Sequence, residues 1–213
     1  ILAKKSGHTY RYLLEDRIIN VLGLKSTTID LSEDLAARMA KGHMDKEVVS
    51  NWDFDVLAPA GGIRSSVVDV LRFLSFQMGL EQTDLAPAIA TTQKLHFDHQ
   101  TQVGLAWLFE NGQYVWHNGG TGGFSSFTGF DKASKRGVVV LTNCTEDVDD
   151  IGFHILNEGK PLKKVRKIID LEESVLDAYI GQYQLAPGML FDVTKQGNQL
   201  KAQLTGQGKF NVY

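Results

Sequence analysis

The sequence is poor in cysteine and in metal-binding patterns. Cys144 is the only cysteine in 213 residues, which excludes an internal disulfide and a cysteine-rich metal site and leaves the cellular compartment open. Among the six histidines, His96 and His99 lie three residues apart, but no third ligand accompanies them at helical or hairpin spacing. We therefore expect surface or loop histidines, and neither a metal ion nor an organic cofactor.

Long apolar runs and a strong net charge are also missing. No run approaches the length of a membrane span, and the N-terminus lacks the basic-then-apolar layout of a signal peptide. The formal charge of −3 gives no reason to expect a nucleic acid partner. A hydrophobic share of 43% with 22% charged residues is instead typical of a soluble globular protein with a real core.

The first half of the chain is predicted to be mainly helical. Apolar residues repeat at helical spacing over residues 9–22 and stop at Gly23, where a C-cap glycine is expected. Another apolar stripe follows Ser65 or Ser66, either of which is a natural N-cap. Less regular segments are expected at residues 32–40 (a short helix), 45–64 (loop-like) and 84–93 (a weaker helix).

The second half is predicted to form an antiparallel sheet. Asn111-Gly112 is the strongest short hairpin signal, and it separates two strand-like segments. The run at residues 137–142 is continuously apolar, as expected of a buried central strand. The predicted strands of this meander are residues 103–109, 113–117, 124–130 and 137–142.

A closing helix is expected over residues 146–157. Its apolar positions would place Val148, Ile151, Ile155 and Leu156 against the sheet. Helices first, then a sheet, then a covering helix indicate an α+β fold class.

Residues 160–170 are rich in lysine and arginine. We interpret them as a solvated connector rather than a contact with an anionic surface, because the run is short and interrupted by apolar residues.

Short strands are expected at residues 179–185, 189–195, 199–204 and 209–213, with a tight turn at Gly197-Asn198. Four strands with open edges are a marginal unit alone. The predicted organisation is a main domain (1–159), a basic linker (160–175) and part of a β-rich domain (176–213).

Residues 116–130, "WHNGGTGGFSSFTGF", gather four glycines beside His117. A phosphate cradle is excluded because no Lys-Ser or Lys-Thr pair follows and the next element reads as a strand. Two interpretations remain equally good from this segment alone. One is a glycine-rich hairpin turn, and the other is a strand edge kept bare so that a ligand can approach the backbone.

Several segments resemble one known superfamily in their order and spacing. They are "PAGGIRSSVVDVLRFL" (59–74), "GLAWLF" (104–109), "HNGGTGGFSS" (117–126) and "GVVVLTN" (137–143). Together they resemble the serine β-lactamase and penicillin-binding-protein superfamily, nearest to class C β-lactamases and their esterase and peptidase relatives. "LEDRIINVLGLKSTT" (14–28) is similar to the "LGM-x-x-T" segment of that family, and "LDAYIGQYQL" (176–185) to a small β-rich domain often appended to it.

The resemblance implies a site built from three motifs: Ser-x-x-Lys, Tyr-x-Asn, and Lys-Thr-Gly or His-x-Gly. His117-Asn118-Gly119 matches the third. By resemblance, His117 would bind substrate or polarise the site. The N–H of Gly120 would supply half of the oxyanion hole, and the nucleophile's own N–H the other half.

The first two motifs are absent from these 213 residues. No serine is followed three residues later by lysine, and no tyrosine two residues later by asparagine. Ser125 and Ser126 lie on a predicted strand without an activating lysine or histidine, so we do not expect either to be the nucleophile. No residue of the chain therefore matches the nucleophile or its general base.

We therefore expect the C-terminal portion of a β-lactamase-like serine hydrolase, inactive by itself, with both missing motifs upstream of Ile1. The parent would take small-molecule or peptide substrates in a periplasmic or secreted setting. An imidazole is mostly neutral at neutral pH and should hold a carboxylate less firmly than lysine, which favours an esterase or peptidase over a strict β-lactamase.

Two alternatives remain open: a non-catalytic binding or assembly module on the same scaffold, and complementation by a separate N-terminal chain. Unpaired sheet edges predict a homo-oligomer or a swapped dimer.

Overall fold

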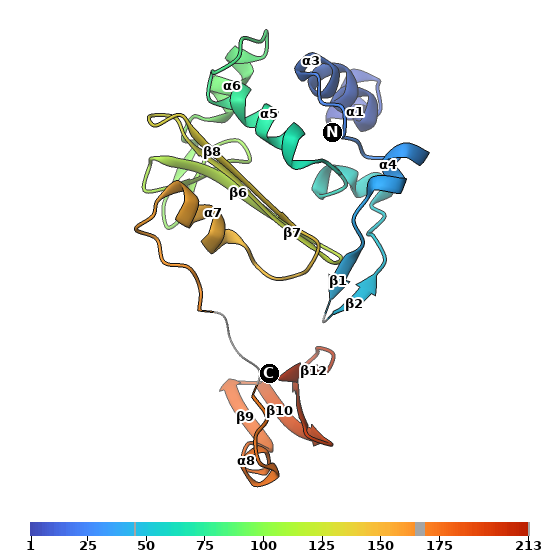
Figure 1. The fold of residues 1–213 in the computed structure, drawn as a ribbon, viewed down its shortest axis with the longest axis vertical. Coiled ribbons are helices and arrows are strands. Elements are labelled where there is room, and N and C mark those ends of the chain that lie inside the picture. The colour runs from blue at the N-terminus through green and yellow to red at the C-terminus, as the bar shows by residue number, and fades with distance from the viewer. Residues whose placement is uncertain (45, 165–168, 213) are drawn as a thin grey trace. The chain divides into compact units, whose positions relative to one another are not determined.

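The computed structural model describes residues 1–44, 46–164 and 169–212. Contacts divide the chain into two units, Ile1–Lys163 and Lys164–Tyr213. The larger unit holds most helices and a six-stranded sheet, and the smaller one a four-stranded sheet (Figure 1). This confirms the predicted α+β class. Of the predicted linker, residues 165–168 lie outside the described residues.

The helix predicted at residues 9–22 forms with a π-helical turn in its middle. The Thr9 side chain caps its start by accepting the N–H of Tyr12 at 3.1 Å. Gly23 ends it with φ 64°, the left-handed conformation expected of a C-cap glycine. The helices of the larger unit are α1 (Leu2–Ser6), α2 (Tyr10–Leu14), η1 (π, Glu15–Ile19), α3 (Asn20–Leu22), α4 (Glu33–Arg38), η2 (3-10, Asp55–Ala60), α5 (Val67–Gln77), α6 (Ala86–Thr92) and α7 (Asp149–Leu156).

Helix α5 connects the helical region to the sheet. The Ser66 side chain accepts the N–H of Asp69 at 3.3 Å, which confirms Ser66 as the N-cap. The buried carboxylate of Asp69 accepts the N–H of Ser26 at 2.6 Å and the hydroxyl of Thr27 at 2.7 Å. Hydrogen bonds of this kind offset the cost of burying a charge. They tie the "LKSTT" segment to α5.

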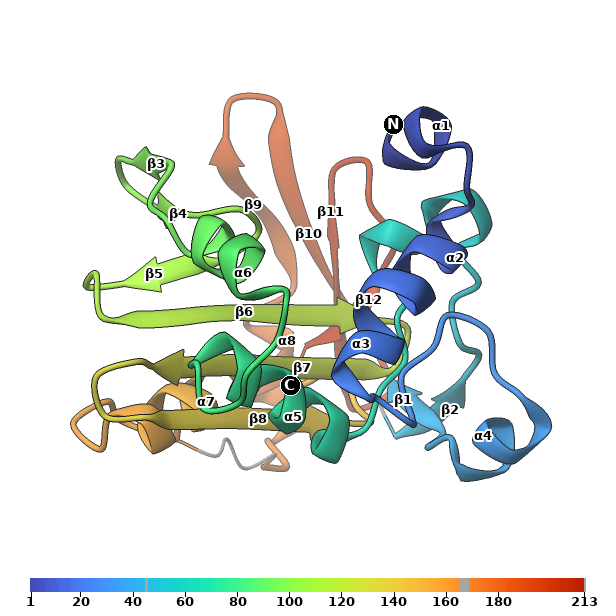
Figure 2. The same ribbon diagram turned by 90° about the horizontal axis from the view of Figure 1, so that it is seen from above.

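The main sheet is an antiparallel meander in the order β3-β4-β5-β6-β7-β8. Figure 2 shows β6, β7 and β8 side by side, with α5 lying across them. Asn111 and Gly112, with φ of 55° and 67°, form the predicted turn between β5 and β6. The strands are β3 (Phe97–Asp98), β4 (Gln102–Val103), β5 (Leu108–Glu110), β6 (Tyr114–Thr121), β7 (Phe124–Asp131) and β8 (Arg136–Thr142).

The strand expected at residues 103–109 is interrupted. Its middle is a turn in which the N–H of Gly104 donates to the carbonyl of Trp107 at 2.7 Å, and Ala106 has φ 64°. The side chain of Trp107 is buried against Leu74 and Phe130. The apolar character that suggested one continuous strand therefore comes from core packing within a turn.

The prediction that residues 137–142 form a central strand is wrong in position. Among the described strands β8 lies at the end of the sheet, and Val138 is its one buried residue. Val139 packs toward α5, and Val138 and Val140 toward α7. The apolar run is explained by the two helices on opposite faces (Figure 1) rather than by strands on both sides.

Helix α7 confirms the expected closing helix but turns a different face to the sheet. Val148 and Leu156 are buried as predicted, whereas Ile151 and Ile155 are 40% and 46% exposed. Gly152 takes the inner position instead, and a Cβ added there would lie 2.1 Å from the ring of Phe127. The missing side chain lets the helix approach the fully buried Phe127 closely.

The region read as loop-like, residues 45–64, contains more structure than expected. Strands β1 (Gly42–Met44) and β2 (Glu47–Val49) form a hairpin. The N–H of His43 donates to the carbonyls of Gly123 and Asn143, so the hairpin is attached to the turn that follows β6. Strands this short give little periodicity, so sequence patterning does not reveal them.

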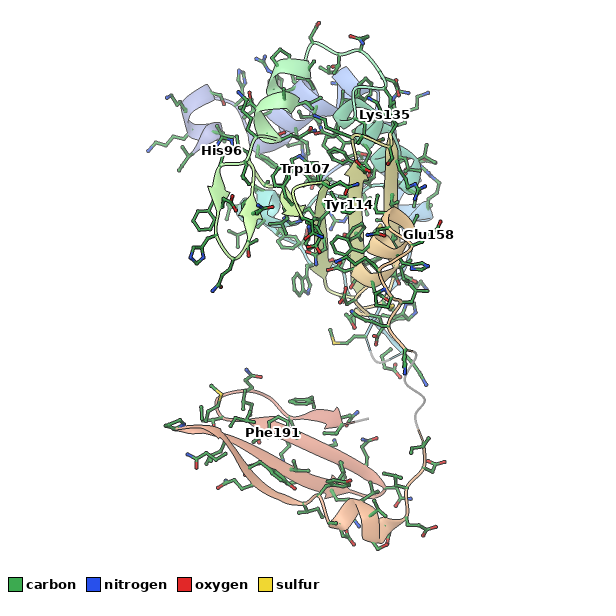
Figure 3. All side chains as sticks on the ribbon, turned by 90° about the vertical axis from the view of Figure 1, so that its left-hand side faces the viewer. His96, Trp107, Tyr114, Lys135, Glu158 and Phe191 are labelled. Carbon is green, nitrogen blue, oxygen red and sulfur yellow. The ribbon has the colours of Figure 1, made fainter. Side chains whose placement is uncertain are left out.

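The smaller unit is a sheet in the order β12-β11-β10-β9 beside one short helix. Phe191, labelled in Figure 3, lies on the same side of this sheet as the core residues Val193 and Ala202. Its elements are α8 (Glu173–Asp177), β9 (Gly181–Ala186), β10 (Met189–Gln196), β11 (Gln199–Leu204) and β12 (Phe210–Val212), close to the predicted strands. None of the helices in the described ranges is long and apolar enough to cross a membrane.

Replacing Gly152 by alanine should destabilise the larger unit by about 1–3 kcal/mol, because the new methyl group overlaps the ring of Phe127 and the helix must move outward. Urea denaturation followed by tryptophan fluorescence measures the change. As a control, Ile155→Ala removes an exposed side chain of the same helix and should cost less than about 1 kcal/mol. Equal effects of the two substitutions would contradict the packing described.

Candidate functional site

The second half of β6 has an unpaired edge. On one side β6 pairs with β7 along its whole length, from Tyr114↔Asp131 to Thr121↔Phe124. On the other side it pairs with β5 through residues 114–116 alone. No described strand pairs with residues 117–121 on that side, so His117, Asn118, Gly119 and Gly120 share one open edge.

The four glycines near His117 have two different physical explanations. A Cβ on Gly122 would lie 2.5 Å from the indole nitrogen of Trp52, and one on Gly123 would lie 2.6 Å from the backbone of Gly42. Gly123 also has φ 81°. These two glycines are required by the turn and by the packing of the β1–β2 hairpin.

Gly120 has no such explanation. It is exposed, and no atom lies within 4 Å of the Cβ that a side chain would add. At Gly119 the nearest atom is the hydroxyl oxygen of Ser126 at 2.9 Å, the movable end of a small side chain. The hairpin turn therefore needs Gly122 and Gly123, whereas Gly119 and Gly120 lie on a bare strand edge. That a ligand approaches this edge stays a prediction.

The register of the β6–β7 pair fixes which way the backbone groups of this edge point. Thr121 and Phe124 are paired across the two-residue Gly122-Gly123 turn, and such closing residues exchange hydrogen bonds. Because hydrogen-bonded and non-bonded pairs alternate in an antiparallel ladder, Gly119 bonds toward β7. The N–H of Gly120 is then directed to the open side, where a ligand oxygen could accept it.

The side chain of His117 lies on the face of the sheet toward α5, since Val115, two residues earlier, packs there against Leu74. Its ring nitrogen Nδ1 lies 2.5 Å from the carbonyl oxygen of Asn118. A carbonyl only accepts, so Nδ1 carries the proton. In the neutral ring, Nε2 is then left as a hydrogen-bond acceptor.

Asn118 points to the opposite face, toward the start of α7. Its amide nitrogen donates to the carboxylate of Asp149 at 2.7 Å. Asp147, two residues earlier, accepts the N–H of Asp149 at 2.9 Å and forms an ion pair with Lys163. The Lys163 backbone N–H in turn donates to Asp150 at 2.8 Å.

The pKa values of the two carboxyl groups that line this edge, Asp147 and Asp149, are shifted in opposite directions. The hydrogen bond from Lys163, helped by the N–H of Asp149, lowers the pKa of Asp147. Burial raises the pKa of Asp149, and the charge of Asp147 adds to this, while the amide of Asn118 opposes it. The pKa of Lys163 is raised by its bond to Asp147.

A shallow cavity of about 210 Å³ lies between the glycine edge, Asn118 and the carboxyls of Asp147 and Asp149, and His117 is not among its lining residues. Its walls are the backbone of the glycine edge, the start of β7 and the segment leading into α7. The lining includes Gly119, Gly120, Ser125, Ser126, Asp147 and Asp149. The cavity therefore combines outward-facing backbone donors with carboxylate oxygens.

A larger cavity of about 530 Å³ lies at the β4–β5 end of the sheet, bounded by His99, Gln102, Glu110 and Trp116. Glu110 forms an ion pair with Lys160 there. No serine borders this cavity, and it offers no backbone edge of the kind found at Gly120. The smaller cavity is therefore the better candidate site.

The serines and histidines considered in the sequence analysis make few contacts at this cavity or lie away from it. Ser125 and Ser126 pair with Gly120 and Gly119 across the ladder, and the one bond involving either hydroxyl in the described structure is a long 3.5 Å contact from Ser126 to the Gly119 carbonyl. The ring of His96 bonds the Thr91 carbonyl at 3.3 Å. Within residues 1–44, 46–164 and 169–212, no three His, Cys, Asp or Glu side chains are grouped closely enough to hold a metal ion.

Asp147 and Asp149 were not among the sequence-predicted site residues. They lie about thirty residues beyond His117 in the chain, and the contact with Asn118 depends on how α7 folds back over the sheet. The acidic stretch "TEDVDD" (145–150), which leads into the first turn of that helix, is the one sequence signal for them. Acidic residues at that position are ordinarily explained by the helix dipole.

These pKa shifts have opposite effects on stability. Because the folded-state pKa of Asp147 is depressed, its carboxylate stabilises the fold above the unfolded pKa of about 3.9, and that contribution is lost as the pH falls through the folded value. The raised pKa of Asp149 means that its ionised form costs stability at neutral pH. This cost is relieved as the pH falls through the raised value.

Replacing Lys163 by methionine should raise the pKa of both Asp147 and Asp149, since each carboxylate loses the attraction of the ammonium group. Titration of the carboxyl carbons by NMR measures both values. Lys132→Met, at an exposed lysine in the β7–β8 turn, serves as the control and should leave them unchanged. An unaltered Asp147 titration in the Lys163 variant would contradict the ion pair.

A family model and a curated protein that match this chain both point to β-lactamases and penicillin-binding proteins. The family model described as Beta-lactamase matches residues 1–156. Penicillin-binding protein 4* of Bacillus subtilis (strain 168) is 22% identical over 250 aligned positions, which cover 100% of this chain and 54% of that protein. The chain thus spans about half the length of this curated relative.

Solved structures of the same group share the fold. A beta-lactamase/D-alanine carboxypeptidase from Pseudomonas syringae superposes with a TM-score of 0.66 at 23% identity, covering 75% of this chain and 56% of that one. A class C beta lactamase from Rhodobacter sphaeroides gives 0.62 at 25% identity, with 68% and 52% covered. The octameric penicillin-binding protein homologue from Pyrococcus abyssi gives 0.62 at 20% identity, with 99% and 52% covered.

The predicted β-lactamase-like fold is confirmed by these superpositions, and its match to about half of each neighbour is consistent with a partial fold. The matched family covers the helical region, the sheet with its open glycine edge, and α7. The chain therefore belongs to the beta-lactamase family, within the superfamily of serine β-lactamases and penicillin-binding proteins.

Proposed function

We propose that this chain supplies the substrate-binding strand and one oxyanion donor of a serine hydrolase that works through an acyl-enzyme. The observation that carries the proposal is Gly120: it is exposed on an unpaired strand edge, and neither its φ nor its packing requires glycine. An extended acyl group could lie against β6 there. The Gly120 N–H would then meet the oxygen that becomes negatively charged in the transition state.

His117 would act at the reacting end of this edge. With Nδ1 bonded to the Asn118 carbonyl, Nε2 is free to accept a hydrogen bond from substrate or from a hydroxyl of the site. A neutral imidazole attracts a carboxylate less than a lysine would. We therefore propose an ester or peptide substrate in preference to a strict β-lactam activity, and a periplasmic or secreted location.

The nucleophile and its base would come from outside these residues, because the 213-residue sequence has neither a Ser-x-x-Lys nor a Tyr-x-Asn motif. The chain alone should then be inactive. Both motifs in the coding sequence upstream of Ile1 would support this proposal. Their absence would favour a non-catalytic binding or assembly module.

An active-site serine probe of the fluorophosphonate or penicillin type should leave the intact mass of the chain unchanged, because Ser125 and Ser126 lack an activating base. Mass spectrometry of the treated chain is the measurement. Covalent labelling that disappears in a Ser125→Ala or Ser126→Ala variant would contradict the proposal and place the nucleophile on β7.

Activity should appear when the chain is combined with a second chain that carries the two missing motifs, and Gly120 should then control the rate. Gly120→Pro removes the outward N–H and should lower the rate of ester hydrolysis by about 10²–10³-fold. Gly120→Ala keeps the N–H in open space and should have a much smaller effect. Equal losses in the two variants would speak against a backbone oxyanion donor.

We also propose self-association through the open edge of β8, which no described strand covers. Edges of this kind readily pair with another chain, and one structural relative is described as octameric. Light scattering should give a mass above the 23.6 kDa of one chain. A monodisperse monomer would contradict this prediction.

A further inference from the structure

The proposed substrate edge has a strongly acidic flank on its α7 side. Asp147 and Asp149 line the same cavity as Gly119, Gly120 and Ser125. They arrive there because α7 folds back so that its first residue meets Asn118, the middle residue of the His-Asn-Gly motif. A substrate group lying over this side of β6 would therefore face carboxylate oxygens.

The negative charge of this flank is only partly compensated. Among the described residues Lys163 is the cation bound to it: its ammonium pairs with Asp147 and its backbone N–H donates to Asp150. None of the ion pairs found among the described residues includes Asp149, whose side-chain partner is the neutral amide of Asn118. Within the part of the chain that the structure describes, one lysine thus faces three carboxylates, and Asp149 has no cationic partner.

The hydrogen bond to Asp149 also occupies one of the two N–H donors of the Asn118 side chain. One N–H of this amide donates to the Asp149 carboxylate at 2.7 Å, so a substrate carboxylate that reached the second N–H would lie beside the Asp149 charge. The other hydrogen-bond donors of this cavity are backbone N–H groups of the glycine edge, and they lie beside the charge of Asp149. A substrate with an anionic group here would meet repulsion, whereas an ammonium group would find an acceptor.

We propose that Asp149 is a specificity-determining residue that selects substrates carrying a protonated amine beside the acyl group and rejects those carrying a carboxylate there. This inference rests on the proposed function, because it assigns a substrate class to the same strand edge. Asp149 does not take part in the chemistry. It acts through charge on whichever group of the substrate enters the cavity.

The test uses binding to the whole chain, which needs no turnover. Three peptides differ only at the C-terminus: N-acetyl-alanyl-alanine with a free carboxylate, its amide, and its 2-aminoethyl amide. Amide chemical shifts of Gly119 and Gly120 in the isotope-labelled chain give each dissociation constant. The ammonium peptide should bind about three- to fivefold more tightly than the neutral amide, and the carboxylate peptide more weakly by a similar factor, as expected for one partly solvated ion pair.

Asp149→Asn should bring the three affinities to within about twofold of one another, because the replacement keeps the shape and removes the charge. Asp84→Asn removes one charge at an exposed position between α5 and α6 and should preserve the wild-type order. Unchanged shifts elsewhere in the spectrum check that each variant is folded. The wild-type preference should also shrink between about 0.02 and 0.3 M salt, which needs no variant.

The outcomes separate the two proposals. Equal binding of all three peptides at Gly119 and Gly120, or a preference that survives Asp149→Asn, overturns the role of Asp149 and leaves the strand edge as the binding site. A preference for the carboxylate peptide does the same. Failure of every peptide to shift Gly119 and Gly120 overturns the proposed function, and the specificity inference with it.

Discussion

The pairing of β6 with β7 is the interaction on which the rest of the larger unit depends. All eight residues of β6 are paired on this side, through a turn whose glycines leave room for Trp52 and Gly42. The ladder satisfies the backbone of β6 on one side completely, so the strand is held even where its other side is open. An edge that is rigid without a second neighbour can receive a ligand without rearranging.

The two faces of this pair are fixed by different helices. Phe130 and Val115 face α5, and Phe127 and Trp116 face α7, where the rings of Trp116, Phe127 and Phe153 lie 4.8 to 5.8 Å apart. Trp107 and Tyr114, labelled in Figure 3, are buried in the α5-side and α7-side clusters respectively. Because neighbouring residues of a strand point to opposite faces, this packing also fixes His117 toward α5 and Asn118 toward α7. Core packing thereby sets the direction of the polar site residues.

Local sequence patterns predicted the features that depend on interactions within a few residues of the chain, such as helix caps and turns. Gly23, Ser66 and Asn111-Gly112 mark a helix end, a helix start and a turn, and each does so through its own backbone or side chain. The fold class followed from such signals, but the strand predicted at residues 113–117 ended at His117, whereas β6 continues to Thr121 and so includes Asn118, Gly119 and Gly120. From the local segment alone, the open edge beyond Trp116 is one of two equal alternatives. The family resemblance favours it, and the register of β5 against β6 shows that no described strand pairs with that edge.

Features that depend on contacts distant in sequence could not be predicted in this way. Ile151 and Gly152 exchange their expected roles because the ring of Phe127 needs the space. The β1–β2 hairpin is held by Gly123 and Asn143, far along the chain. Asp149 enters the site through Asn118 alone, and its position at the start of a helix already has an ordinary explanation.

The segment "NGGTGG" contains glycines that packing requires and a glycine that packing does not require. Substitutions at these positions should therefore have different effects. A side chain at Gly122 or Gly123 would overlap Trp52 or Gly42 and destabilise the fold. A library of variants screened for expression alone would therefore retain glycine at both positions. Gly120 sits in open space and such a screen would accept many residues there. If Gly120 has the role proposed above, selection for ligand binding or turnover would restore glycine at that position. Glycines two or three residues apart would then be kept for two different reasons, one for packing and one for binding.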